Sequence, residues 1–373
     1  MPFCRTICPY CDFAKFPLRR SQAERYLQAL AREAQRAPAV AVETIFLGGG
    51  TPNAHPPEQL ARLLALLRER FAIHQAHETT IELNPEPAWC DESAFAAYRA
   101  AGIDRLSFGV QSLEASELRT LGRTHSGSDV GRVVARARAA GFENLSLDLI
   151  FGVPGQSRES WSRTLEAALT LEPTHLSAYG LEVEPGTPFW DRREAGPADF
   201  PGEDLEADLY EFAIERLEAA GYEHYEISNF ARPGFRCAHN LNYWRDGEYL
   251  GLGVGAASFL GGERRANLRD LERYLAALEA GEAVPAERER LAGAARLGEA
   301  TMLALRTREG VDCARFAERY GVDFMSFYQP VIAELGAEGL LAIEPPRVHL
   351  TRRGRFLANA VCGAFVNFRG AAA

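Results

Sequence analysis

Three cysteines near the start of the chain constrain it more than any other feature. Cys4, Cys8 and Cys11 follow the spacing C-x3-C-x2-C, and Phe13 stands two residues after the third. Iron–sulfur clusters are held by cysteine thiolates, and a [4Fe–4S] cubane takes four ligands. A loop this short reaches three irons and leaves the fourth open to a chelating cofactor. The spacing therefore predicts a [4Fe–4S] cluster whose open iron binds S-adenosylmethionine.

A structural zinc site is the main alternative for these cysteines. Structural zinc sites are closed and four-coordinate, and they are typically built from two separated ligand pairs. No second pair lies near this loop, and position 13 is Phe rather than a fourth ligand. Disulfides are less favoured, because three close cysteines cannot pair evenly, and the total of 7 cysteines is odd. Unpaired thiols are typical of a reducing compartment, so we expect a cytoplasmic protein.

Composition limits the class of partner. The chain has 373 residues, which is enough for one large domain and a smaller one. Its net charge of −10 argues against a dedicated nucleic-acid binder, which usually carries a basic domain or stripe. No run of about 18 apolar residues is present, so we expect no transmembrane segment. A peripheral contact with a membrane surface and a homodimer both stay open.

Short apolar strands alternate with amphipathic helices over the first part of the chain. We expect strands at 44–47, 80–83, 105–110, 145–151, 175–181 and 225–228, and helices at 22–36, 58–70, 93–101, 129–140, 160–171 and 205–219. Repeated β-α units predict a parallel sheet with helices outside it. About six units fall short of the eight of a complete TIM barrel. We therefore predict an α/β fold in which residues 1–262 form a partial (β/α)6-type barrel, with its ligand site at the carboxyl ends of the strands.

The remaining chain has a different pattern. We expect a linker helix within 263–284, and then a C-terminal domain at 285–373. That domain is expected to hold helices near 288–305, 313–320, 326–335 and 354–365, with a β-hairpin at 340–351 between the last two. Helices followed by a hairpin resemble a winged-helix module. We expect this module to pack against the mouth of the barrel.

Polar or glycine residues follow the strands where a cofactor would lie. Glycines at 48–50 allow a ligand to approach the backbone closely. An arginine can fork onto a carboxylate, and a carboxylate within an apolar strand is costly unless it is paired. Taken singly, each residue fits a structural hydrogen bond equally well, but their joint placement at strand ends indicates a site. The candidate contacts are Gly50, Thr51, Glu82, Gln111, Arg123 and Asp148.

A second unusual stretch is the aromatic segment at 237–245, which we expect to be a loop. It contains His239, Asn240, Tyr243 and Trp244. Histidine is an axial ligand of haem iron, and an aromatic wall suits the face of a porphyrin. From the residues alone, a histidine with satisfied hydrogen bonds beside a packed tryptophan is the better supported interpretation. Both interpretations stay open at this point.

Together, these motifs resemble a known family over nearly the whole chain. The matching stretches are 4–13, 48–53, 82–86, 105–112, 121–126, 148–156, 177–189, 225–231 and 239–244. They are similar to the radical SAM proteins related to oxygen-independent coproporphyrinogen III oxidase. The resemblance implies a cluster on the three cysteines, S-adenosylmethionine at the six candidate contacts, and haem at the aromatic segment. It also implies that His239 is the favoured haem ligand.

The resemblance further separates two branches of that family. The oxidase typically carries another cysteine where this chain has Phe13, and the pattern HNxxYW at 239–244 is typical of the haem-chaperone branch. We therefore expect haem binding and transfer to an unidentified acceptor protein. Oxidative decarboxylation of coproporphyrinogen is the alternative, and an RNA-modifying radical SAM enzyme is a third; whether the chain is an enzyme stays open. Relatives have one more strand ahead of Pro2, so we expect that the given sequence starts inside the natural protein.

Overall fold

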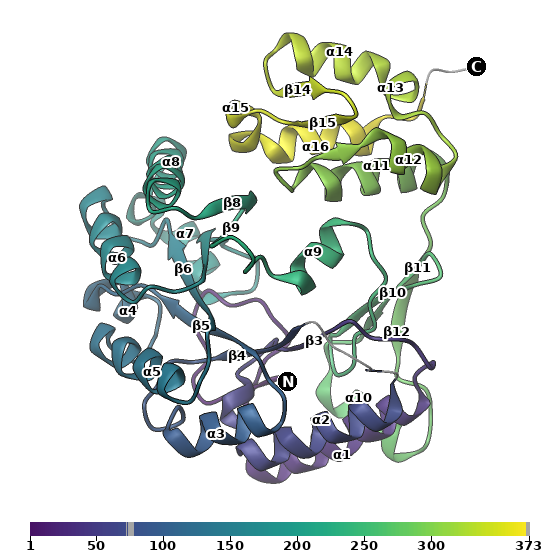
Figure 1. The fold of residues 1–373 in the computed structure, drawn as a ribbon. Coiled ribbons are helices and arrows are strands. Elements are labelled where there is room, and N and C mark those ends of the chain that lie inside the picture. The colour runs from purple at the N-terminus through teal and green to yellow at the C-terminus, as the bar shows by residue number, and fades with distance from the viewer. Residues whose placement is uncertain (72, 74–77, 371–373) are drawn as a thin grey trace.

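One curved sheet organises the first two thirds of the chain (Figure 1). The computed structural model describes residues 1–71, 73 and 78–370. The sheet has the strand order β3-β4-β5-β6-β7-β9-β8, and β3 to β7 are parallel. Its strands are β3 Thr44–Leu47, β4 Glu78–Leu83, β5 Arg105–Gln111, β6 Asn144–Phe151, β7 His175–Gly180, β8 Glu223–Glu226 and β9 Asn229–Ala231.

The predicted partial barrel is confirmed, with one addition at its edge. Strand β9 is antiparallel to both β7 and β8, so β8 runs in the same direction as β7. Six strands therefore share one direction, and the hairpin strand β9 is inserted between the last two. The predicted strand at 225–228 corresponds to β8, and the turn into β9 follows it.

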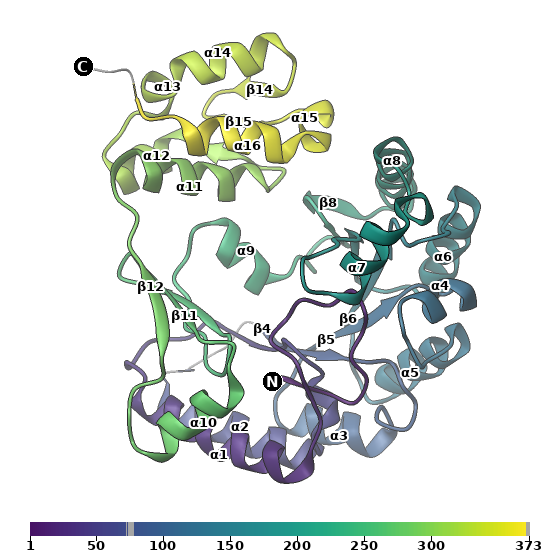
Figure 2. The same ribbon diagram turned by 180° about the vertical axis from the view of Figure 1, so that it is seen from behind.

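Helices cover the outer face of the sheet, as Figure 2 shows from behind. Their starts follow from local chemistry, because the side chains of Asp91, Ser126 and Ser157 accept from backbone N–H groups of the first turn. Their inner faces carry apolar residues at helical spacing, such as the buried Leu60, Leu63, Leu64 and Leu67. The helices of this part are α1 Arg20–Arg36, α2 Pro57–Arg70, α3 Glu92–Ala100, α4 Ala115–Thr120, α5 Gly127–Ala139, α6 Arg158–Thr170, α7 Pro188–Ala195 and α8 Glu203–Ala219, with short 3₁₀ turns at Pro52–Ala54 and Pro197–Asp199. Of these, α7 lies beside the cysteine loop rather than on the outer face, and its Phe189 amide donates to the Pro9 carbonyl at 3.1 Å.

The cysteine loop is fixed at both of its ends. Strands β1 Phe3–Cys4 and β2 Phe16–Pro17 pair in parallel on either side of it. The amide of Phe16 donates to the Pro2 carbonyl at 2.8 Å, and the amide of Leu18 donates to the Cys4 carbonyl at 2.9 Å. Phe3 is fully buried and contacts the ring of Tyr26 edge-on at 5.6 Å. The loop therefore starts and ends on the barrel.

The segment after the barrel differs from the prediction. The expected loop at 237–245 contains the helix α9 Ala238–Trp244. The expected helix within 263–284 is present as α10 Leu271–Glu279, and a strand that was not predicted, β11 Glu263–Asn267, precedes it. With β10 Ala257–Leu260 and β12 Ala286–Glu289, β11 forms an antiparallel sheet in the order β10-β11-β12.

The helix predicted to start at 288 instead begins at 293, because 286–289 belong to β12. Both β11 and β12 are highly charged, and their sequences lack the apolar alternation that indicates a strand. These residues were therefore predicted to form a linker and the start of a helix. In the structure they place opposite charges across the ladder, with Arg288 Nη1 2.6 Å from Glu263 Oε1.

A buried carboxylate ties this later segment to the first helix. Glu33 of α1 is 7% exposed. It accepts from the Gly253 amide at 2.7 Å, from Asn267 Nδ2 at 2.8 Å and from the Tyr274 hydroxyl at 2.7 Å. Helix α10 consequently packs against α1, as Figure 1 shows.

The C-terminal part has its own hydrophobic core, separate from that of the barrel. The predicted hairpin is confirmed as β14–β15 and gains a third strand in the order β13-β15-β14. The predicted last helix is divided in two at Leu357. The elements are α11 Gly293–Leu305, β13 Val311–Asp312, α12 Cys313–Tyr320, α13 Phe324–Phe327, α14 Gln329–Ala337, β14 Leu341–Glu344, β15 Arg347–Leu350, α15 Arg352–Phe356 and α16 Ala358–Asn367.

We propose that residues 1–262 and 285–373 are separate domains, and the separate core of the second supports this division. Over the described ranges, no helix combines the length and the apolar character needed to cross a bilayer.

Candidate functional site

The three loop cysteines lie close together, and donors from the barrel point at two of them. Cys4 is buried, Cys8 and Cys11 are half-buried, and all three thiols are free. The Thr51 hydroxyl donates to Cys4 Sγ at 3.4 Å, and Arg123 Nη1 donates to Cys8 Sγ at 3.5 Å. Burial raises the pKa of the Cys4 thiol, whereas the Thr51 hydrogen bond and the Arg123 charge act in the opposite direction. Both donors therefore stabilise thiolates, which are the form that binds metal.

The arrangement of the thiols fits a cluster better than a single ion. Among the described residues, no three His, Cys, Asp or Glu side chains converge closely enough to hold one metal ion. Zinc draws its ligands to about 2.0–2.3 Å of a single centre. A cubane instead offers a separate iron to each cysteine. Three neighbouring free thiols, with no fourth cysteine ligand in the loop, fit a [4Fe–4S] cluster that keeps one iron open.

The glycine run after β3 is required by close contacts within the protein. The Gly49 amide, at φ 101°, donates to Glu82 Oε2 at 3.0 Å. A Cβ atom at Gly48 would lie 2.5 Å from the same oxygen, and one at Gly50 would lie 2.7 Å from the Met1 carbonyl oxygen. The Gly50 amide itself donates to that carbonyl at 2.8 Å. The amides expected to face a cofactor thus already bind Glu82 and the start of the chain.

Two carboxylates lie on the concave face, Glu82 on β4 and Asp148 on β6, with β5 between these two strands. Asp148 of β6 accepts from the hydroxyls of Ser107, Ser146 and Ser177 at 3.0, 3.2 and 2.8 Å. Burial raises the pKa of Asp148. Burial and the charge of Asp148 raise the pKa of Glu82 to about 7. Glu82 therefore exchanges a proton near neutral pH, while the serine hydroxyls hold Asp148 in place. The pair can accept hydrogen bonds from hydroxyl or ammonium groups.

Gln111 and Arg123 complete the ends of the central strands. Gln111 has a φ of 68°, which is rare for a residue other than glycine, at a bulge where β5 meets β6. Arg123 Nη2 donates to Asn84 Oδ1 at 2.8 Å and also to the Gly109 carbonyl. Its guanidinium thus connects the cysteine loop with the ends of β4 and β5. Several of its donors are used inside the protein, and the remaining N–H groups stay available for a carboxylate.

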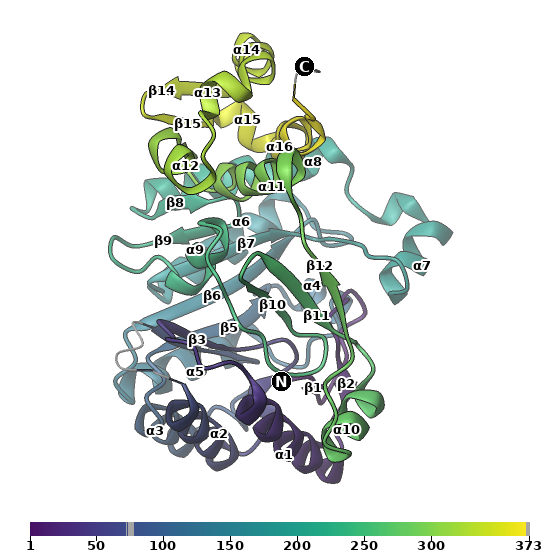
Figure 3. The ribbon, with the colours of Figure 1, turned by 90° about the vertical axis from the view of Figure 1, so that its right-hand side faces the viewer.

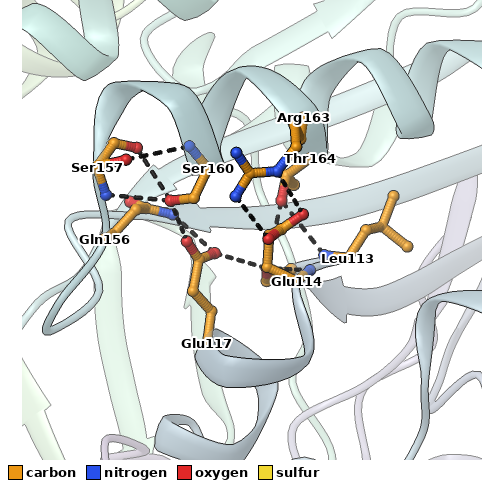
Figure 4. Close-up of polar contacts among 9 residues, drawn as sticks. Leu113, Glu114, Glu117, Gln156, Ser157, Ser160, Arg163 and Thr164 are labelled. Carbon is orange, nitrogen blue, oxygen red and sulfur yellow. Dashed lines mark hydrogen bonds and ion pairs between the residues drawn. The ribbon is translucent and has the colours of Figure 1, made fainter.

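A buried network that the sequence did not reveal supports these strand ends (Figure 4). Glu117 of α4 is 3% exposed. It accepts from Ser112 Oγ at 2.6 Å, Gln156 Nε2 at 3.0 Å and Ser160 Oγ at 2.6 Å. The network joins the loops after β5 and β6 to the start of α6. One signal was present in the sequence, because Ser157 and Ser160 have the spacing of a helix N-cap.

Both ring nitrogens of His239 have hydrogen-bond partners inside the protein. Its Nδ1 lies 2.8 Å from the Thr44 hydroxyl, and its Nε2 lies 2.9 Å from the Tyr243 hydroxyl. Its ring stacks on Phe46 with centroids 5.0 Å apart. Burial lowers the pKa of His239 to about 4, so the imidazole is neutral at physiological pH. A neutral imidazole is the form that ligates metals, and iron would have to displace one of the two hydroxyls.

The four predicted haem residues fall on two faces of α9. His239 and Tyr243 line a cavity of about 1010 Å³, whose wall includes the outer strand β3 of the sheet. Asn240 and Trp244 do not line it. Trp244 packs on the small core around Tyr225, and a guanidinium of the C-terminal domain lies 5.8 Å from its ring. The structure therefore separates the four into two pairs spaced four residues apart.

Comparison with known proteins assigns the chain to a family. Residues 1–168 match the Radical SAM superfamily, and residues 291–357 match the HemN C-terminal domain. Heme chaperone HemW of Bacillus subtilis is 36% identical over 371 residues, which are 98% of this chain and 97% of the relative. Heme chaperone HemW of Mycobacterium tuberculosis is 39% identical over 371 residues, covering 97% and 92%.

Among solved structures, coproporphyrinogen III oxidase (HemN) from Escherichia coli, described as a radical SAM enzyme, matches with a TM-score of 0.85 and 27% identity. The match covers 98% of this chain and 88% of that one. The chain therefore belongs to the radical SAM superfamily and, within it, to the family of the heme chaperone HemW.

Proposed function

We propose that this protein is a haem chaperone, which binds haem and passes it to an acceptor protein. The observation that carries this proposal is the similarity, over nearly the full length, to two proteins named heme chaperone HemW. As a radical SAM protein, the chain has a [4Fe–4S] cluster and S-adenosylmethionine as its cofactors. The acceptor protein is unidentified, and we place the protein in the cytoplasm because its cysteines are free.

In this proposal Cys4, Cys8 and Cys11 hold the cluster. When bound, the cluster supplies an electron to S-adenosylmethionine. Thr51 and Arg123 stabilise two of the thiolates through the donor contacts described above. The cofactor contacts that we propose are Gly50, Thr51, Glu82, Gln111, Arg123 and Asp148.

Haem is proposed to contact α9, with His239 as the axial ligand. The neutral imidazole, the stacked Phe46 and the aromatic Tyr243 support this role. Tyr243 would release Nε2 when iron binds, because its hydroxyl occupies that nitrogen in the structure. Asn240 and Trp244 are included in the proposed haem site, although they lie on the other face of α9. A homodimer and a peripheral membrane contact belong to the same proposal as arrangements for haem transfer.

The fold similarity to HemN favours a second candidate, a coproporphyrinogen oxidase. One anaerobic experiment separates the two functions. The cluster is reconstituted, and haem binding and coproporphyrinogen turnover are then measured side by side. We expect stable haem uptake without decarboxylation; rapid decarboxylation without stable haem uptake would replace the chaperone proposal by the oxidase.

The haem ligand is tested in the same preparation. His239→Ala is expected to lose haem and to keep the visible absorbance of the cluster. His349→Ala, which changes a histidine of β15 in the C-terminal domain, is the matched control and is expected to retain haem. Equal haem retention in both variants would remove His239 from the site.

A further inference from the structure

Helix α9 ends at an aspartate that is locally unfavourable. The Asp246 amide donates to the Tyr243 carbonyl at 2.9 Å, and the Gly247 amide donates to the Asn242 carbonyl at 2.8 Å. This is a Schellman ending, and its left-handed residue is usually glycine. Here Asp246 takes that position with a φ of 55°. A negative charge at the C-terminal end of a helix also opposes the helix dipole.

The C-terminal domain supplies the donors that stabilise the Asp246 carboxylate. The Asp246 side chain is 7% exposed, and Arg319 Nη2 lies 3.2 Å from its Oδ2. The Tyr320 hydroxyl donates to the same oxygen at 2.5 Å, and Arg296 also forms an ion pair with it. Arg319 Nη1 further donates to the Arg245 carbonyl at 3.0 Å. All of these donors belong to α11 or α12, and Figure 3 shows α9 directly beneath those helices.

The other end of α9 is held by the barrel. Glu78 of β4 accepts from the Ala238 amide at 3.0 Å and from the His239 amide at 3.2 Å. The thiol of Cys237 also donates to it, at 3.3 Å. Helix α9 has 7 residues and is therefore too short to be stable alone. Its first end is therefore held by the Glu78 carboxylate of the sheet. Its last end is held through the Asp246 carboxylate, which the C-terminal domain binds.

We propose that Asp246 is a positioning residue that latches α9 to the C-terminal domain, so that this domain controls how tightly α9 holds haem. The haem part of this inference rests on the proposed function. With the latch closed, α9 is kept against β3, and the Thr44 hydroxyl stays on Nδ1 of His239, so the ring keeps its orientation when Tyr243 releases Nε2 to iron. With the latch open, the last turn of α9 loses its buried anchor, and the contact between His239 and Thr44 is no longer held. An acceptor that moves the C-terminal domain would thereby loosen haem.

The test uses the full chain and two substitutions, Asp246→Asn and Asp246→Gly. Both residues suit the left-handed position, so the helix ending is kept while the carboxylate is lost. The matched control is Arg352→Gln, which breaks another contact between the domains: Arg352 Nη2 lies 2.9 Å from Glu211 Oε1 and 2.6 Å from Glu215 Oε1 on α8. Hydrogen–deuterium exchange of residues 238–245 is measured without haem, and haem affinity is measured by absorbance titration.

Both Asp246 variants are expected to exchange faster within 238–245 and to bind haem about tenfold more weakly, a size typical of coupling between sites. Arg352→Gln is expected to change neither quantity. Unchanged exchange in both Asp246 variants would overturn the latch, and so would faster exchange spread over the whole chain. If the native chain fails to bind haem, the proposed function fails, while the exchange data still decide the latch. If the Asp246 variants do not fold, Tyr320→Phe removes one donor; no local change in that variant would also overturn the latch.

Discussion

Replacing Glu82 by Gln tests the electrostatics of the concave face. The carboxylate of Glu82 accepts from the Gly49 amide and lies near Asp148. Burial and the Asp148 charge raise the pKa of Glu82 from 4.5 to about 7. A carboxyl group whose pKa is higher in the folded state opposes folding when it ionises, because the unfolded chain ionises more easily. The variant removes this penalty and keeps an oxygen that can accept from Gly49.

The magnitude follows from the two pKa values. Their difference, 7 − 4.5 = 2.5, corresponds to about 3.4 kcal/mol at about 1.36 kcal/mol per pKa unit. The penalty is absent below pH 4.5, grows between pH 4.5 and 7, and is complete above pH 7. Glu82→Gln is therefore expected to raise the free energy of unfolding by about 3 kcal/mol at a pH of about 8, and by well under 1 kcal/mol at a pH of about 4.5.

Urea unfolding of the cofactor-free protein at a series of pH values measures this difference. The native and variant stabilities should converge at acidic pH and separate as the pH rises. A stabilisation that does not depend on pH would refute the electrostatic reasoning, because a packing gain does not titrate. A variant that is less stable than the native chain at a pH of about 8 would show that the ionised Glu82 is held by stronger contacts than those described.

Three further substitutions test other parts of the structure. Replacing any one of the three loop cysteines by Ala should abolish most of the reconstituted iron, whereas Cys313→Ala should keep it; iron analysis that finds equal iron in all four variants would contradict the cluster assignment. Gly50→Ala places a Cβ 2.7 Å from the carbonyl oxygen of the first residue and should cost about 1–3 kcal/mol in thermal unfolding. Gly363→Ala lies inside α16 with no atom within 4 Å of its added Cβ and should raise stability by up to about 1 kcal/mol, and equal losses in the two glycine variants would be evidence against the close contact. Glu78→Gln removes the charge of a buried carboxylate that accepts from the Ala238 and His239 amides, and should lower the free energy of unfolding by about 1–3 kcal/mol in urea, whereas an unchanged free energy of unfolding would mean that the charge adds nothing to these hydrogen bonds.

The strand ends were predictable from the sequence for a topological reason. In a parallel sheet, the carboxyl ends of all strands meet at one edge, so Glu82 and Gln111 could be brought together by counting β-α units. Asp148 was also expected at a strand end, but it lies inside β6, three residues before Phe151. The contacts that hold them were not predictable. Ser107, Ser146 and Ser177 surround Asp148 only because three strands adopt one particular register. Glu117 lies in α4, a short helix that was not predicted from the sequence, and it is buried by contacts from the loops after β5 and β6.

The errors lie where charge pattern and burial disagree. Strands β11 and β12 consist mainly of Arg and Glu and carry no alternating apolar signal. Across the ladder Arg264 faces Glu289, whereas Arg288 faces Arg265 and forms its ion pair diagonally with Glu263. The segment around His239 looked like a loop because its own residues do not favour a helix. Glu78 stabilises the first end of this segment, although it is far from the segment in sequence. Asp246 stabilises the other end through a contact with the C-terminal domain.

The three donors that satisfy Glu33 have a consequence for biosynthesis. They come from residues 253–274, more than 200 positions after Glu33 itself. Ribosomes synthesise about 5–20 residues per second, so Glu33 waits roughly 12–48 s for its last donor, Tyr274, which is 241 residues later. During that interval the carboxylate stays in water, and the helix that packs on Phe3 is not yet anchored. The packing of α1 behind the start of the cysteine loop is therefore complete only after translation has passed Tyr274.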